Sequence, residues 1–319
     1  MLRTLVTGGA GFIGSHVIRR FLKEYSSYHI INLDKLTYAG NLENLRDVED
    51  FENYTFIKGD ICDEVLVAHI FSQYAIDGVI HLAAESHVDR SISDPMAFIR
   101  TNVLGTAVLL NAARHSWGEE LENKLFYHVS TDEVYGESKT DEPFTEATGV
   151  LRPTNPYSAS KAAAEMIVMS YIESFNMNIK ILRCNNVYGP NQYPEKLIPK
   201  FVRLLKNDEK CTIHGVNSAK VRRAFMHVDD VIDAVETVWK KGKAGEVYNI
   251  ASDDEMSVMD VTQLIIKTIK DTEDYDAWID YVEDRPFNDQ RYHICAKKLK
   301  ELGWTQKKTR EDLINFLKY

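Results

Sequence analysis

Short runs of apolar and β-branched residues alternate with longer amphipathic segments through the first half of the chain. These runs predict strands at 3–8, 29–34, 54–60, 77–84, 124–131 and 178–184. Helices are predicted over 12–25, 94–116 and 156–175. Strands that alternate with helices indicate βαβ units joined in a parallel sheet, and strands as apolar as 77–84 suit a sheet covered on both faces. The pattern therefore predicts an α/β fold with a doubly wound parallel sheet of the Rossmann type.

After about residue 185 the alternation loosens. The pattern there predicts helices within 189–207, 228–242, 257–269 and 309–319 and a strand at 246–252. Scattered elements joined by long loops indicate a smaller, mixed α/β C-terminal domain built onto the sheet. We therefore expect a Rossmann domain over 1–184, completed by parts of about 220–252, and a discontinuous second region over 185–319.

Two of the predicted helices, 94–116 and 156–175, carry apolar residues on more than one face. A helix of this kind needs a second packing partner. The partner is either the interior of a large sheet or a second subunit, and the sequence leaves both readings open. A homodimer formed through these helices is the hypothesis that follows.

Composition narrows the class of protein. The chain has 319 residues, of which 44% are hydrophobic and 27% charged, as expected for a soluble globular protein. Its net charge of −10 and its lack of a basic run argue against nucleic acid as a partner. The four cysteines are scattered without CxxC spacing, which argues against a metal site and against disulfides. We also expect no signal peptide and no apolar run long enough to span a membrane, and hence a cytoplasmic protein.

The stretch TGGAGFIG places Gly8, Gly11 and Gly14 between the first predicted strand and the first helix. Glycine is needed where a backbone turns tightly and approaches a pyrophosphate at a helix N-terminus. Asp34 closes the second strand, where an acid can bind both ribose hydroxyls of NAD and repel the extra phosphate of NADP. Lys35 beside it leaves that preference less certain. The alternative reading is a tight strand–helix turn with no ligand.

Tyr157 and Lys161 are four residues apart on one face of a predicted helix. The lysine charge can lower the pKa of the tyrosine, which can then remove a proton from a sugar hydroxyl while a hydride leaves the carbon. Thr131, at the end of its strand, can hydrogen-bond the same hydroxyl. The alternative is an exposed lysine over a packed tyrosine.

Asp132 and Glu133 follow Thr131 directly. Two adjacent acids are often only solvated loop residues, but here they are candidates for an acid and a base. Neighbouring residues in a strand point to opposite faces. Both acids can therefore reach one substrate only if the strand has ended by Asp132.

Several motifs together resemble the extended short-chain dehydrogenase/reductase family: TGGAGFIG, HLAAESHVDRS, STDEVYG and YSASK. The chain is most similar to the nucleoside-diphosphate-glucose 4,6-dehydratases, through NNVYGPNQYPEKLIPKF and YVEDRPFNDQRY as well. The likeness covers essentially the whole chain. It implies NAD as a cofactor that is bound tightly and regenerated each turnover, with a nucleotide sugar as the substrate.

The resemblance also implies the chemistry. Tyr157 takes the C4 hydroxyl proton as NAD takes the C4 hydride, Glu133 removes the C5 proton, and Asp132 protonates the departing C6 hydroxyl. Hydride then returns to C6. Related 4-epimerases lack the acid pair, and related decarboxylases carry only the second acid. A 4-epimerase and a non-catalytic NAD-binding regulatory protein remain the alternatives.

Further positions are carried over by resemblance. Those assigned to the cofactor are Phe12, Ile13, Thr37, Asp60, Ile61, Leu82, Ala83, Ala84, Thr101 and Val187. Those assigned to the substrate are Ser86, Asn186, Lys196, Leu197, Arg223, Arg285 and Asn288. Arg222 is an alternative to Arg223 for the diphosphate, and the choice between uracil and thymine stays open. His81 and His87 are read as structural residues.

Overall fold

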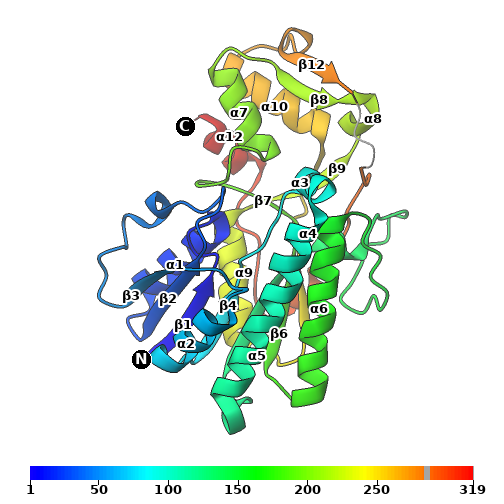
Figure 1. Cartoon of the computed structure of the whole chain (residues 1–319). Helices are drawn as coiled ribbons and strands as arrows, with labels where there is room; N and C mark the ends of the chain where they lie inside the picture. Colours follow the sequence, from blue (N-terminus) through cyan, green and yellow to red (C-terminus); the bar gives the residue numbers. More distant parts are fainter. Residues whose placement is uncertain (284–287, 319) are drawn as a thin grey trace.

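The computed structural model describes residues 1–283 and 288–318 (Figure 1). Its centre is a seven-stranded parallel sheet with the order β3-β2-β1-β4-β5-β6-β10. The strands are β1 (Leu2–Thr7), β2 (Tyr28–Asp34), β3 (Tyr54–Lys58), β4 (Gly78–His81), β5 (Leu125–Thr131), β6 (Ile179–Cys184) and β10 (Val247–Ile250). The predicted Rossmann-type α/β fold is confirmed.

Helices cover both faces of the sheet (Figure 1). One layer consists of α1 (Phe12–Glu24) and α9 (Val228–Lys241), and the other of α2 (Glu64–Tyr74), α5 (Gly105–Trp117) and α6 (Pro156–Phe175). Side chains alternate along each strand. Val6 and Ile80 therefore pack in the α1/α9 core, whereas Leu5 and Val79 pack in the α2/α5/α6 core. Burial on both sides explains why the strands are apolar throughout.

The helix predicted over 94–116 is not regular. It begins as α4 (Pro95–Phe98), widens into a π-helical segment (Ile99–Leu104), and continues as α5. In the wide segment the Asn102 side chain bonds both the amide and the carbonyl of Glu85 and reaches the Ser160 hydroxyl. These tertiary contacts hold the distortion in place.

The same helical run corrects one sequence-based expectation. We expected no apolar run of membrane-spanning length, yet Pro95–Glu120 has 26 residues and is apolar enough to qualify. About 44% of its most apolar window is buried within the protein. Val108, Leu109 and Leu110 lie in the α2/α5/α6 core, as in the core helix of a globular domain.

A second group of elements sits above the carboxyl ends of the strands (Figure 1). Its helices are α7 (Leu197–Lys206), α8 (Gly215–Ala219), α10 (Val258–Lys270) and α12 (Arg310–Lys318). Its strands are β7 (Asn186–Tyr188), β8 (Cys211–His214), β9 (Arg222–His227), β11 (Glu255–Ser257) and β12 (Ile279–Val282). Strands β11, β9 and β7 form one small sheet, and β12 and β8 form another. A separate hydrophobic core joins these elements. Two short helices, α3 (Val88–Ser93) and α11 (Lys297–Glu301), lie in connecting segments.

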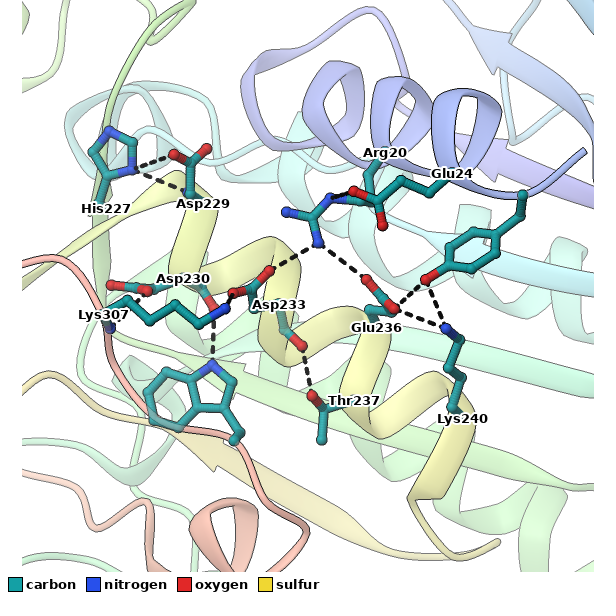
Figure 2. A network of polar contacts seen from close by, with 12 residues as sticks. Arg20, Glu24, His227, Asp229, Asp230, Asp233, Glu236, Thr237, Lys240 and Lys307 are labelled. Carbon is teal, nitrogen blue, oxygen red and sulfur yellow. Dashed lines mark hydrogen bonds and ion pairs between the residues drawn. The ribbon is translucent and has the colours of Figure 1, made fainter.

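Helix α9 is fixed by polar contacts to α1 on one side and to the C-terminal chain on the other (Figure 2). Arg20 of α1 pairs with Asp233 at 2.8 Å and with Glu236 at 3.0 Å. Lys307 also pairs with Asp233, at 2.6 Å, and Asp230 accepts the backbone N–H of Lys307 at 2.9 Å. The chain leading to α12 is thereby held against the sheet layer.

Candidate active site

The glycine loop lies after β1, at the point in the sheet where the strand order reverses between β1 and β4. Ligands of open α/β sheets bind at such points, beyond the carboxyl ends of the strands. Gly8 has a φ of 72°, and a Cβ there would lie 2.7 Å from the Ala83 backbone. A Cβ on Gly14 would lie 2.2 Å from the Gly8 carbonyl oxygen. The loop is therefore close-packed, and it leads directly to the N-terminus of α1.

Asp34 ends β2 beside this loop. Its carboxylate accepts the backbone N–H groups of Ala10 at 2.9 Å and Leu36 at 2.8 Å. Burial raises the pKa of Asp34, and these two donors oppose the rise. Lys35 points elsewhere and pairs with Asp60 at 2.7 Å. This pairing partly neutralises the one cation that complicated the expected preference for NAD.

A cavity of about 400 Å³ follows the glycine loop and the carboxyl edge of the sheet. All residues expected to contact the cofactor line it: Gly8, Gly11, Phe12, Ile13, Gly14, Asp34, Lys35, Thr37, Asp60, Ile61, Leu82, Ala83, Ala84, Thr101, Tyr157, Lys161 and Val187. The glycine cradle, the helix N-terminus and Asp34 suit the pyrophosphate and the ribose of a dinucleotide.

A second cavity, of about 550 Å³, adjoins the first and shares Ser86, Glu133, Asn186, Lys196, Leu197 and Phe225 with it. Arg223 and Asn288 line this second cavity too. Arg222 instead pairs with Glu255 at 3.1 Å. The geometry therefore favours Arg223 as the arginine that faces a substrate. Arg285 lies outside the described residues.

The two acids leave their strand together. β5 ends at Thr131, and a 3-10 turn (Asp132–Tyr135) begins with the next residue. The Thr131 hydroxyl caps this turn by accepting the Glu133 N–H at 3.3 Å. Asp132 and Glu133 both line the first cavity, as does Tyr157 of α6. The strand has therefore ended before Asp132, which is the condition under which both acids can reach one substrate.

Burial raises the pKa of both carboxyl groups, but they have different charged neighbours. Asp132 is only 2% exposed, and burial followed by repulsion from Glu133 raises its pKa to about 7. The pKa of Glu133 is also raised by burial, while the positive charge of Arg223 and a hydrogen bond from Asn155 lower it. Arg223 and Asn155 thus favour the ionised form of Glu133, whereas repulsion from Glu133 favours the protonated form of Asp132, as expected where one acid accepts and the other donates a proton.

Burial shifts the pKa of both Tyr157 and Lys161. Burial and the neighbouring Glu133 charge raise the pKa of Tyr157, although a hydrogen bond with Thr131 opposes this. Burial also lowers the pKa of Lys161, to about 8. Its ammonium group donates to the Val129 carbonyl at 2.6 Å.

Several polar residues around the acids were not singled out from the sequence. Asn185 donates to Asp132 at 2.6 Å, and Asn155 donates to Glu133 at 3.3 Å. The Tyr292 hydroxyl lies 3.5 Å from Glu133. The position of Asn185, directly after β6, was a usable signal, since neighbouring parallel strands end at one edge of a sheet.

The two histidines that we interpreted as structural lie in different environments. His81 is buried, with its ring nitrogens 2.7 Å from the Thr7 hydroxyl and 3.0 Å from the Thr106 hydroxyl. This is a satisfied core histidine, as expected. His87 instead lines the second cavity and lies 3.4 Å from Glu195.

The sheet, the cleft and the residues gathered in it are those of the extended short-chain dehydrogenase/reductase enzymes. A family model described as GDP-mannose 4,6-dehydratase matches residues 5–316. The dTDP-D-glucose 4,6-dehydratase of Mus musculus is 49% identical over 308 residues, which cover 96% of this chain and 84% of the mouse protein. The chain belongs to the nucleoside-diphosphate-sugar 4,6-dehydratases, which are hydro-lyases of that larger family.

Two further relatives extend the comparison. A trifunctional UDP-glucose 4,6-dehydratase/UDP-4-keto-6-deoxy-D-glucose 3,5-epimerase/UDP-4-keto-L-rhamnose-reductase of Arabidopsis thaliana is 45% identical over 97% of this chain and 45% of that protein. The crystal structure of DesIV, a dTDP-glucose 4,6-dehydratase from Streptomyces venezuelae with NAD bound, superimposes with a TM-score of 0.91 at 37% identity. That match covers 99% of this chain and 96% of DesIV.

Proposed function

We propose that this chain converts a nucleoside-diphosphate-glucose into the 4-keto-6-deoxy sugar nucleotide with loss of water. The observation that carries the proposal is the joint position of Asp132, Glu133 and Tyr157 on one cavity. Two acids beside a tyrosine supply the groups needed for elimination as well as for oxidation. Oxidation alone needs only the tyrosine and its partners.

NAD is the cofactor that fits the first cavity, and when bound it supplies a hydride acceptor at C4 and a hydride donor at C6. We assign the glycine loop to its pyrophosphate and Asp34 to its adenosine ribose. Lys161, one turn beyond Tyr157, is assigned to the nicotinamide ribose. On this basis the NAD-binding part is 1–184 together with α9 and β10, and the rest of 185–319 binds the substrate.

Tyr157 takes the proton of the C4 hydroxyl in this proposal. The Thr131 hydroxyl, which hydrogen-bonds Tyr157, holds that C4 hydroxyl in place. The resulting ketone acidifies the C5 proton, and Glu133 removes it as a general base. Asp132, whose pKa is about 7, retains a proton for the departing C6 hydroxyl through much of the neutral range.

The second cavity is assigned to the nucleoside diphosphate. Arg223 faces this cavity, and its guanidinium group lies 4.4 Å from the centre of the Tyr292 ring. An arginine so held can pair with phosphate oxygens in a bidentate manner. Ser86, Asn186, Lys196, Leu197 and Asn288 complete the assignment.

Incubation with dTDP-glucose or UDP-glucose, followed by mass spectrometry, tests the proposal. With at least one of the two we expect a product lighter by one water, and the faster of the two identifies the preferred base. A product of unchanged mass would point to a 4-epimerase instead. If both substrates are recovered intact with NAD present, catalysis is absent and the regulatory reading stands.

We also propose a cytoplasmic homodimer. The helical run and α6 expose large apolar side chains, with Met96 66%, Ile99 47%, Leu104 45% and Met166 49% exposed. Exposed apolar side chains gathered on neighbouring helices typically mark a protein interface. The four cysteines are free thiols, which fits a reducing compartment.

Light scattering at working concentration is expected to give the mass of a dimer. A double variant, Met96→Glu with Met166→Glu, would bury charge in the interface and should be a monomer. A wild-type mass of one chain would remove the dimer proposal. Val65→Lys is the control and should leave the mass unchanged. Val65 lies on α2, outside this surface, and is 82% exposed.

A further inference from the structure

Asn185 is a buried amide held between the acid Asp132 and the segment that follows β10. Its Nδ2 donates to Asp132 Oδ2 at 2.6 Å. Its Oδ1 accepts the backbone N–H of Ser252 at 3.1 Å, and the backbone N–H of Asn185 donates to the Ile250 carbonyl at 3.2 Å. The residue is 5% exposed, so water does not compete freely for these bonds.

These partners leave the side chain one orientation. A backbone N–H can only donate, so the atom facing Ser252 must be the amide oxygen. The NH₂ group therefore faces Asp132 and can only donate there. The amide is fixed by a main-chain group whose own position is set by the loop after β10.

The orientation has a consequence for the protonated acid. Oδ2 of Asp132 must accept from Asn185, and the carbonyl oxygen of a carboxylic acid is a better acceptor than its hydroxyl oxygen. Oδ1 accepts from the Thr131 hydroxyl at 3.1 Å when the acid is ionised. That hydroxyl can rotate and accept instead, whereas the Asn185 NH₂ group cannot, so the proton of the neutral acid is favoured on Oδ1. Thr131 and Asp132 both line the first cavity, to which the sugar is assigned.

We propose that Asn185 is a positioning residue for Asp132, fixing the carboxyl oxygen that carries the proton so that the proton is presented to the departing C6 hydroxyl. The inference rests on the proposed function, in which Asp132 is the acid of the elimination. In that step the C6–O bond breaks, the Asp132 proton goes to the leaving oxygen, and water is released.

The charged and titratable groups around Asp132 define how a variant should behave. Glu133 follows it in the turn, Arg223 approaches from β9, Tyr157 from α6 and Cys184 from β6. Glu133 raises the pKa of Asp132, while Arg223 and the Asn185 amide lower it. Loss of the amide donor should therefore move the Asp132 titration to higher pH.

The test compares two substrates in the NAD-loaded enzyme. One is the natural nucleoside-diphosphate-glucose and the other its 6-deoxy-6-fluoro analogue, whose fluoride leaves as an anion and needs little help from an acid. A positioned acid contributes roughly 10²–10⁴ in rate, and we expect Asn185→Leu to lose about tenfold on the natural substrate. It should lose little on the fluoro analogue. The alkaline limb of kcat should shift to higher pH, and KM should change little.

Asn249→Leu is the matched control. Asn249 is equally buried, accepts from the Tyr135 hydroxyl at 2.9 Å and lies on the adjacent strand β10. Its loss should leave the ratio of the two rates unchanged. Asn185→Ser, which keeps a short donor, should give an intermediate ratio and serves if the leucine variant does not fold.

Two results would overturn the positioning role. One is an equal loss on both substrates with an unshifted alkaline limb. The other is wild-type behaviour of both Asn185 variants. The proposed function is judged separately, because wild-type enzyme that releases no water from the natural substrate refutes that function whatever the variants do.

Discussion

Tyr157→Phe is expected to abolish turnover while leaving NAD bound. The variant removes one hydroxyl, which hydrogen-bonds Thr131, from a residue that lines the same cavity as both acids. Without it nothing accepts the C4 hydroxyl proton, so the first oxidation and all later steps stop. We expect a loss at or above the upper part of the roughly 10²–10⁴ range for a positioned acid or base. Reduced nicotinamide absorbance in single-turnover mixing measures the first step directly.

Tyr135→Phe provides the control for this substitution. Tyr135 is buried, and its hydroxyl donates to Asn249 at 2.9 Å. It lies outside the residues that line the two cavities. Its removal should cost some stability and little activity. NAD content, measured after heat release, should match wild type in both variants, and unimpaired turnover by Tyr157→Phe would refute the role assigned to Tyr157.

The sheet could be predicted because its strands are buried on both faces and therefore read as apolar runs. The irregular helix before α5 could not. Its π-helical segment depends on Asn102 bonding Glu85 and Ser160, which lie 17 and 58 residues away in the chain. The local periodicity of the sequence does not show contacts between residues so far apart in the chain.

The candidate site, too, could be predicted only in part from the sequence. Thr131, Tyr157 and Lys161 were placed together because strand ends and the following helix converge at one edge of a parallel sheet. Asn185 and Tyr292 were missed, since they meet the acids from 53 and 159 residues away.

The burial of Tyr157 and Lys161 could not be predicted for a related reason. Sequence spacing places the lysine near the tyrosine. It does not show that burial raises the pKa of Tyr157 and lowers the pKa of Lys161.

Glu133→Gln is expected to separate oxidation from elimination. The glutamine keeps the shape of the side chain and can still meet Asn155, but it cannot accept the C5 proton. Oxidation at C4 should continue, so reduced nicotinamide should accumulate while water loss falls by roughly 10²–10⁴. Wild-type enzyme in deuterium oxide should place solvent deuterium in the product, and the variant should do so far more slowly. Glu137→Gln, in the adjoining loop where its carboxylate accepts the Gln290 N–H, should behave as wild type.

The rate of elimination should depend on pH through both acids. Elimination needs Glu133 ionised and Asp132 protonated, so the rate should fall below the pKa of Glu133 and again above that of Asp132, near 7. The two groups interact, and the limbs therefore belong to the pair as a whole. Asp132→Asn should remove the alkaline limb along with most of the rate on the natural substrate. An alkaline limb that persists in Asp132→Asn would show that another group supplies the proton.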